Sequence, residues 1–262
     1  MFRRLTAFEM KLQLRNFLTV FFSLAFPIIM LVLFGTIYGN EPNEFTGGMG
    51  TVDLMVPAYI CMIVAVTGLM SLPLTLASYR EQKILKRFMA TPVQPLQLLL
   101  VQLVINLITT VLGIALLLIT AKPLFQLQFL GSIPETVLAF LLVVLCIFSL
   151  GLMIAGVAPN GKAASTISYV IYFPMLFLSG ASMPLYIMPP SLVALSKALP
   201  LTYGVRLLSG VWLGGRLLSY RLELGVLTGV ALLCVSLAVR FFKWEQALST
   251  KMRKSVYSWE IR

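Results

Sequence analysis

The chain has 262 residues, of which 59% are hydrophobic and only 11% are charged. Because an ordinary soluble domain carries about 25% charged residues, this composition excludes a protein whose whole surface is in contact with water. The formal net charge of +11 would favour nucleic acid as the partner of a soluble protein. Here the charges flank long apolar runs, so they indicate orientation in a membrane instead. We expect an all-α integral membrane protein that contacts membrane lipid and binds no nucleic acid.

Residues 1–16 are expected to form an interfacial helix along the inner membrane surface. Apolar and basic residues recur there at helical spacing on neighbouring faces: Phe2, Leu5, Phe8 and Leu12, and Arg4, Lys11 and Arg15. Such a two-faced basic helix is typical of segments that lie in the headgroup layer. The alternative is a basic tail that only sets orientation.

Six apolar runs are predicted to cross the membrane, because a spanning helix needs about 20 mostly apolar residues. The predicted spans are 17–38, 54–79, 95–121, 136–158, 163–181 and 221–242. The last run is short and reaches spanning length only if Arg221 and Arg240 extend their charged ends into the headgroup layer. In that run Gly225 and Gly229 form a G-x-x-x-G pair, which we expect to pack within the subunit rather than at a dimer seam.

The basic residues predict the orientation of these spans. Fifteen of the 20 lysines and arginines fall in the segments 1–15, 80–92, 158–163 and 240–262. Since basic residues collect in short cytoplasmic loops, both termini, including the tail 243–262, are expected in the cytoplasm.

The loop at 80–92 is predicted to be a short cytoplasmic helix with two faces. Arg80, Lys83 and Arg87 recur on one side, and Ile84 and Phe88 form an apolar pair beside them. An apolar pair on a basic helix favours docking to a protein. The alternative is a lipid-facing loop whose charges only orient the chain.

The segment 182–220 is apolar but is interrupted by proline and glycine. Irregular backbone at membrane depth survives only where protein or a water-filled space surrounds it. We therefore expect two short half-helices that dip in from the outside and line the outer mouth. The alternative is a structured external loop on the headgroups.

One string imitates a nucleotide site. Residues 156–163 match the phosphate-loop pattern G-x-x-x-x-G-K-[ST] except that Ala163 replaces the hydroxyl residue. The string also joins two predicted membrane helices rather than a strand and a helix. We interpret Lys162 as an orienting charge.

Groups that carry catalysis are scarce in this sequence. Histidine is absent, and no Asp or Glu lies in the charge-free stretches 16–40, 54–79, 88–121, 136–161, 163–196 and 224–239. Cys61, Cys146 and Cys234 have no metal-ligand spacing. We expect no enzymatic activity, no metal and no cofactor in this chain. Neutral polar groups remain at membrane depth: Ser71, Thr75, Asn106, Thr109, Thr110, Ser149, Ser168 and Tyr169. Because ion-driven carriers usually hold ionisable groups there, energy is expected to arrive from outside the bilayer.

Two segments resemble the permease subunits of type-2 ABC exporters, the class of drug, antibiotic and polysaccharide exporters. The first is YREQKILKRFMATPV, in which the matching residues are Arg80, Glu81, Leu85, Arg87, Thr91 and Pro92. The second follows the fifth predicted span, and its matching residues are Gly180, Pro184, Pro200, Tyr203 and Arg206. Both segments occur in order between six predicted helices, so the resemblance covers nearly the whole chain.

The resemblance implies a single transmembrane domain over 1–262 in the plasma membrane of a bacterium or archaeon. It implies a partner ABC ATPase subunit, which holds ATP and magnesium, and a second permease, identical or related. It assigns ATPase docking to Arg80, Glu81, Lys83, Ile84, Arg87 and Phe88. It assigns an external re-entrant gate to Gly180, Pro184, Pro200, Tyr203 and Arg206. The expected function is export of an amphiphilic drug, antibiotic, lipid or lipid-linked glycan, and the alternative is a membrane scaffold or assembly factor.

Overall fold

The computed structural model describes residues 2–41, 49–81, 95–182 and 188–241, and every element in these ranges is helical. The first elements are α1 (Phe2–Leu14), α2 (Phe17–Val20), the π-helical η1 (Phe21–Ala25) and α3 (Phe26–Tyr38). They are followed by α4 (Thr51–Ala65), the π-helical η3 (Val66–Ser71), α5 (Leu72–Glu81), α7 (Pro95–Phe125), α8 (Ile133–Val157) and α9 (Gly161–Leu178). The last are α10 (Pro190–Ser196), α11 (Pro200–Trp212), the 3-10 turn η5 (Leu217–Ser219) and α12 (Arg221–Phe241).

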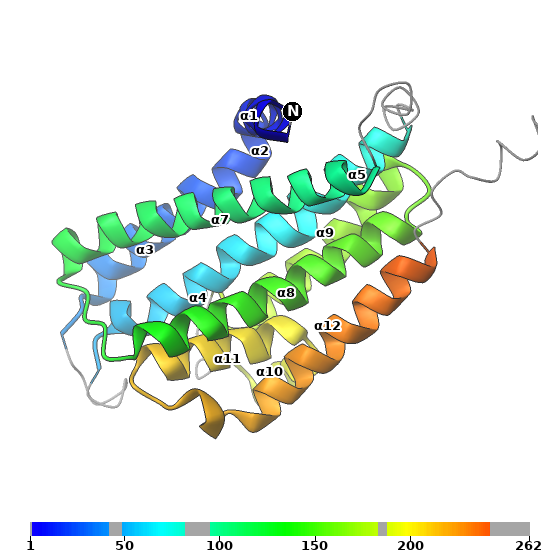
Figure 1. Ribbon diagram of the computed structural model, residues 1–262. Helices are drawn as coiled ribbons and strands as arrows, with labels where there is room; N and C mark the ends of the chain where they lie inside the picture. Colours follow the sequence, from blue (N-terminus) through cyan, green and yellow to red (C-terminus); the bar gives the residue numbers. More distant parts are fainter. Residues whose placement is uncertain (1, 42–48, 82–94, 183–187, 242–262) are drawn as a thin grey trace, which may run out of the picture.

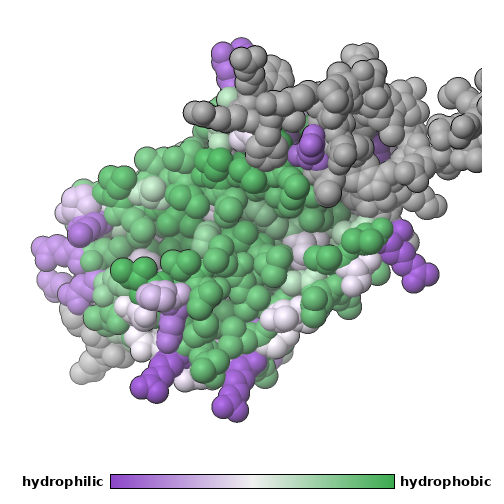
Figure 2. Space-filling model, viewed as in Figure 1, coloured by the Kyte–Doolittle hydropathy of each residue, from purple (hydrophilic) through white to green (hydrophobic). Residues whose placement is uncertain are grey.

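Five helices in the described part of the chain are long and apolar enough to cross a membrane. They are Phe17–Tyr38, Thr51–Glu81, Gln97–Phe125, Ile133–Val157 and Arg221–Arg240. They run side by side in one bundle (Figure 1). Figure 2 shows an apolar belt across the middle of the bundle, with hydrophilic residues gathered around its margins. The chain is therefore an all-helical, multi-pass membrane protein.

The predicted count of six spans is met only in part, because α9 is not among these five helices. This helix has 18 residues, and its first half carries Lys162 together with Ser165, Thr166 and Ser168, which lower its hydropathy. It nevertheless packs against α5, η3, α8 and α11. A sixth crossing by α9 stays a prediction.

The helix α1 lies across the end of the bundle. Figure 1 shows it almost end on, whereas the spanning helices are seen from the side. It contacts α2 and α7, and Asn16 ends the turn after it by accepting a hydrogen bond from the backbone N–H of Thr19 at 3.3 Å. The position of α1 in the headgroup layer stays a prediction.

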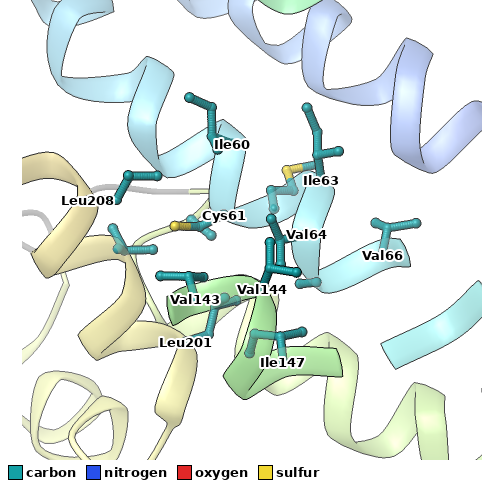
Figure 3. Close-up of a cluster of buried hydrophobic side chains, with 14 of the residues drawn as sticks. Ile60, Cys61, Ile63, Val64, Val66, Val143, Val144, Ile147, Leu201 and Leu208 are labelled. Carbon is teal, nitrogen blue, oxygen red and sulfur yellow. The ribbon is translucent and has the colours of Figure 1, made fainter. Parts of the chain in front are cut away.

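The span Thr51–Glu81 is the centre of the bundle. Its most apolar stretch is 89% buried, compared with 22% for both the first and the last span. Figure 3 shows why: Cys61 and Val64 of α4 lie among Val143 of α8 and Leu201 and Leu208 of α11. Because side chains on all faces of this helix are covered by protein, the other spans carry most of the surface left for lipid.

Glycines let helices of the bundle approach one another at backbone distance, at the central span and at a second crossing. A Cβ atom built on Gly151 of α8 would lie 1.9 Å from the carbonyl oxygen of Gly68 in η3. A Cβ atom on Gly113 of α7 would lie 2.8 Å from the carbonyl oxygen of Ser23 in η1. Only residues without a side chain fit at such crossings.

The G-x-x-x-G pair of α12 does not pack in this way. No described atom lies within 4 Å of a Cβ built on Gly225 or on Gly229, although α12 packs extensively on α8. The prediction that this pair packs within the subunit is wrong, because these glycines are on the uncovered face of the helix.

All three cysteines are free and buried, as predicted. Cys61 and Cys146 have no exposed surface and Cys234 is 2% exposed. Each packs as a small apolar side chain in the core.

At the end of the bundle opposite α1, one side chain joins three helices. The amide oxygen of Asn40 accepts hydrogen bonds from the backbone N–H of Val52 at 2.9 Å and of Asp53 at 3.2 Å. Its amide nitrogen donates to the carbonyl of Phe125 at 2.9 Å and to the carboxylate of Asp53 at 3.1 Å. The ends of α3, α4 and α7 are thereby held together.

We predict that Gly151→Ala will destabilise the protein, because the added methyl group would collide with the backbone of Gly68. Overpacking of this kind costs about 1–3 kcal/mol. Thermal unfolding of the purified protein in detergent measures the effect. Gly229→Ala makes the same chemical change inside α12 on an uncovered face and should not lower the melting temperature, because alanine favours a helix more than glycine does. Equal melting temperatures for both variants would contradict the close crossing.

Candidate functional site

The structure describes only part of the predicted docking segment. Arg80 and Glu81 are the last residues of α5, so the central span continues directly into this segment. Lys83, Ile84, Arg87 and Phe88 lie outside the described residues. Arg80 is half-buried, and its Nη2 atom has no hydrogen-bond partner within the described part of the chain.

The carboxylate of Glu81 makes a contact that the sequence did not reveal. Its Oε2 accepts a hydrogen bond from the backbone N–H of Gly161 at 2.9 Å. Gly161 is the first residue of α9, and the unpaired N–H groups at a helix start carry partial positive charge. Glu81 therefore accepts a hydrogen bond that the first N–H of α9 would otherwise lack, and it connects α5 to α9. The side chain of Asn160 accepts from the N–H of Ala163 at 2.8 Å and caps the same turn.

Beside this connection lies a cavity of about 530 Å³, which we name the α1-side cavity. It is formed by α1, α2, η3, α5, α7 and α9. Its lining residues are Glu9, Leu12, Gln13, Asn16, Thr19, Ser71, Leu74, Thr75, Ser78, Tyr79, Glu81, Gln102, Gly161, Lys162 and Ser165. The sequence had suggested no cavity here, because its walls come from four separate segments of the chain, which are 9–19, 71–81, the region of Gln102 and 161–165.

Glu9 is the most deeply placed charged group of the α1-side cavity, with only 6% of its surface exposed. Its Oε2 accepts a short hydrogen bond from the Tyr79 hydroxyl and a second from the Gln102 amide at 3.0 Å. Both donors are neutral. Sequence reasoning missed Glu9 because it had treated α1 only as an apolar and a basic face. The signal was the pair Glu9 and Gln13, one helical turn apart on an otherwise apolar side.

From this cavity a chain of polar side chains continues into the bundle along α7. Gln13 donates to the Asn106 amide oxygen at 3.2 Å, and Asn106 donates in turn to the carbonyl of Gln102 at 2.8 Å. One turn further on, the hydroxyls of Thr110 and of Thr67 lie 2.8 Å apart. Thr67 belongs to the π-helical η3, and π-helical turns are frequent at functional sites. The polar groups predicted at Asn106 and Thr110 therefore lie between the cavity and the centre of the bundle.

At the opposite end, two of the predicted gate residues line one cavity. Gly180 and Arg206 are among the residues around a space of about 370 Å³, together with Met55 and Tyr59 of the central span. Gly180 has φ +88°, a conformation that favours glycine, at the turn where α9 ends. Arg206 comes from α11, which packs on α4, α8, α9 and α12.

The other gate residues are positioned around α11. Pro200 is at the start of this helix, where its missing N–H has no consequence. The Tyr203 hydroxyl donates to the carbonyl of Lys197 at 2.8 Å and fixes the turn between α10 and α11. Pro184 lies outside the described residues. The predicted pair of half-helices corresponds to α10 and α11, and its membrane depth stays a prediction.

We predict that Glu81→Ala will loosen the first turn of α9, whereas Glu81→Gln will not, because the glutamine oxygen still accepts from Gly161. Loss of a capping acceptor costs about 0.5–2 kcal/mol, and the exposure of Glu81 favours the lower end. Hydrogen–deuterium exchange of the backbone amides near Gly161 measures this. If both variants speed exchange equally, the charge of Glu81 matters rather than its hydrogen bond.

Comparison with known proteins agrees with this architecture. Residues 1–213 match the family described as ABC-2 type transporter. A similar protein is "ABC transporter G family member 20" of Dictyostelium discoideum, which is 28% identical over 192 residues. The aligned region covers 71% of this chain and 25% of that relative, so the chain spans about a quarter of the relative's length. The resemblance seen in the sequence is confirmed: the chain belongs to the ABC-2 type transporter family and forms a multi-pass, helical membrane permease.

Proposed function

We propose that this chain is the permease subunit of an ATP-driven exporter and that a separate ABC ATPase subunit hydrolyses the ATP. The observation that carries the proposal is the course of the central span. At one end of Thr51–Glu81, Met55 and Tyr59 line the cavity that holds Gly180 and Arg206. At its other end, Arg80 and Glu81 begin the predicted docking segment. One buried helix of 31 residues therefore joins the two predicted sites.

A helix of this length spans about 45 Å, at about 1.5 Å per residue. A displacement of the docking segment by an ATPase would be passed along it, because its neighbours are packed too closely to absorb the motion locally. The Nη2 atom of Arg80 has no hydrogen-bond partner among the described residues, which supports docking, since a buried guanidinium nitrogen needs an acceptor. ATP and magnesium would be held by the partner and not by this chain.

The proposed assembly contains a second permease, identical or related, so that the pathway lies between two copies. Its substrate would be an amphiphile: a drug, an antibiotic, a lipid or a lipid-linked glycan. The spans offer apolar side chains and neutral hydroxyls, such as those of Thr67 and Thr110. These groups support this class, because sites for small amphiphiles are built from apolar side chains and a few polar contacts. The basic inner segments support an orientation with both termini in the cytoplasm. The proposed location, the plasma membrane of a bacterium or archaeon, rests on the family resemblance alone.

We predict that reversing Arg80, Lys83 and Arg87 to Glu will release the ATPase or uncouple hydrolysis from transport. Loss of one partner of a buried charged pair costs about 2–5 kcal/mol. Co-purification of the ATPase subunit and substrate efflux from vesicles are the two measurements. Phe88→Ala is the companion variant, because it changes no charge and so cannot alter orientation in the membrane. It should weaken coupling while expression persists.

Lys162→Ala provides the control, since it removes a basic residue from the inner surface outside the docking segment. It should leave both ATPase binding and hydrolysis near their original level. The docking role would be contradicted if the triple variant and Phe88→Ala both kept the ATPase bound and exported substrate at the original rate. The segment would then only orient the chain. Failure of any ATPase to co-purify with the unaltered protein would instead favour a membrane scaffold.

A further inference from the structure

The charged side chains around the α1-side cavity differ in their exposure to solvent and in their hydrogen-bond partners. Glu81 and Lys162 are exposed to solvent, and Glu81 already binds the N–H of Gly161 at 2.9 Å. Glu9 is almost fully buried, and the hydrogen bonds from Tyr79 and Gln102 come from neutral groups. Removing a carboxylate from water is costly unless a cation compensates it. Among the described residues, the side chains that hydrogen-bond Glu9 are neutral, so they orient this anionic group of the cavity without neutralising it.

The rest of the lining suits the polar end of an amphiphile. Hydroxyl and amide groups of Ser71, Thr75, Ser78, Asn16 and Gln13 surround the space, and each offers an oxygen that accepts a hydrogen bond. Leu12 and Leu74 add an apolar patch for methylene groups. The volume of about 530 Å³ lies within the range of about 300–1,000 Å³ found for small-molecule sites.

Two observations favour a cation over an anion such as phosphate. The first is the buried carboxylate of Glu9, which repels a second negative charge. The second is that the start of α9, the natural anion site in this cavity, is already occupied by the Glu81 carboxylate. One wall of this cavity is α1, the crosswise helix of Figure 1 that is predicted to lie in the headgroup layer, so a bound ammonium there would keep its chain in the bilayer.

We propose that the α1-side cavity binds the ammonium group of an amphiphile, with Glu9 as its counter-ion and with Tyr79 and Gln102 as residues that orient Glu9. A resident amine lipid and a transported organic cation share this chemistry. The inference concerns binding and needs no ATP, so its test is separate from that of the exporter function.

The test uses the purified full-length protein in nanodiscs of phosphatidylglycerol, which carries no amine. The probe is an alkyl chain with a photoreactive diazirine next to a primary ammonium headgroup, whose N–H groups can donate to the lining oxygens. Peptide mapping after irradiation should find saturable labelling of α1, α5 and α7. Glu9→Gln keeps an oxygen for the bonds from Tyr79 and Gln102 but removes the charge. The probe concentration that gives half-maximal labelling should rise about tenfold, as expected for loss of one charge-assisted contact.

Two controls make the result specific. Glu223→Gln removes a carboxylate at the start of α12, outside this cavity, and should leave labelling unchanged. A probe with the same chain and a neutral hydroxyl headgroup should not label the unaltered protein saturably, whether or not Glu9→Gln folds. Equal labelling by the neutral probe, or a folded Glu9→Gln protein that binds the ammonium probe as tightly as before, would overturn the proposal.

A competition arm identifies the source of the ammonium group. Addition of phosphatidylethanolamine to the nanodiscs should reduce labelling if a lipid amine occupies the cavity. Undiminished labelling would assign the cavity to a free amphiphilic cation. Both results support the ammonium site, and labelling confined to other segments in either membrane would refute it.

Discussion

The close contact between Gly68 and Gly151 is the constraint on which the rest of the bundle depends. It brings α8 against the backbone of the central span, and α12 and α11 then pack on α8. A larger residue at either position would separate these helices and open the buried core of Figure 3. The hydrophobic effect offers little attraction between helices inside a bilayer, so close van der Waals packing of this kind carries much of the stability.

The sequence predicted the spanning helices well where apolar runs are long, because the bilayer imposes a length on them. It could not rank them by burial. The run that became the central helix and the run that became α12 have similar composition, yet the first is covered on all faces and the second on one side only. The pair Gly225 and Gly229 shows the same limit, since a small-residue spacing indicates that close approach is possible but not from which direction a neighbour comes.

Two of the residues predicted for the gate share one cavity, and their role as a gate stays a prediction. Gly180 and Arg206 come from one proline-rich stretch, and the structure brings them to one cavity. The α1-side cavity was not predictable, because Glu9, Tyr79 and Gln102 are far apart in the chain and each is unremarkable by itself. Glu9 gains significance only when α1 folds back across the bundle and removes it from water. Tertiary placement, rather than any motif, creates that anionic group.

The burial of the three native cysteines has a practical consequence. A thiol reagent must reach the sulfur atom, and Cys61, Cys146 and Cys234 have almost no exposed surface. Spin labels or fluorophores attached to single introduced cysteines should therefore report from the chosen positions with little background, and no native cysteine has to be replaced. Distances between such labels on α1 and on α11 would follow both ends of the central helix during a transport cycle, in the protein with its native core.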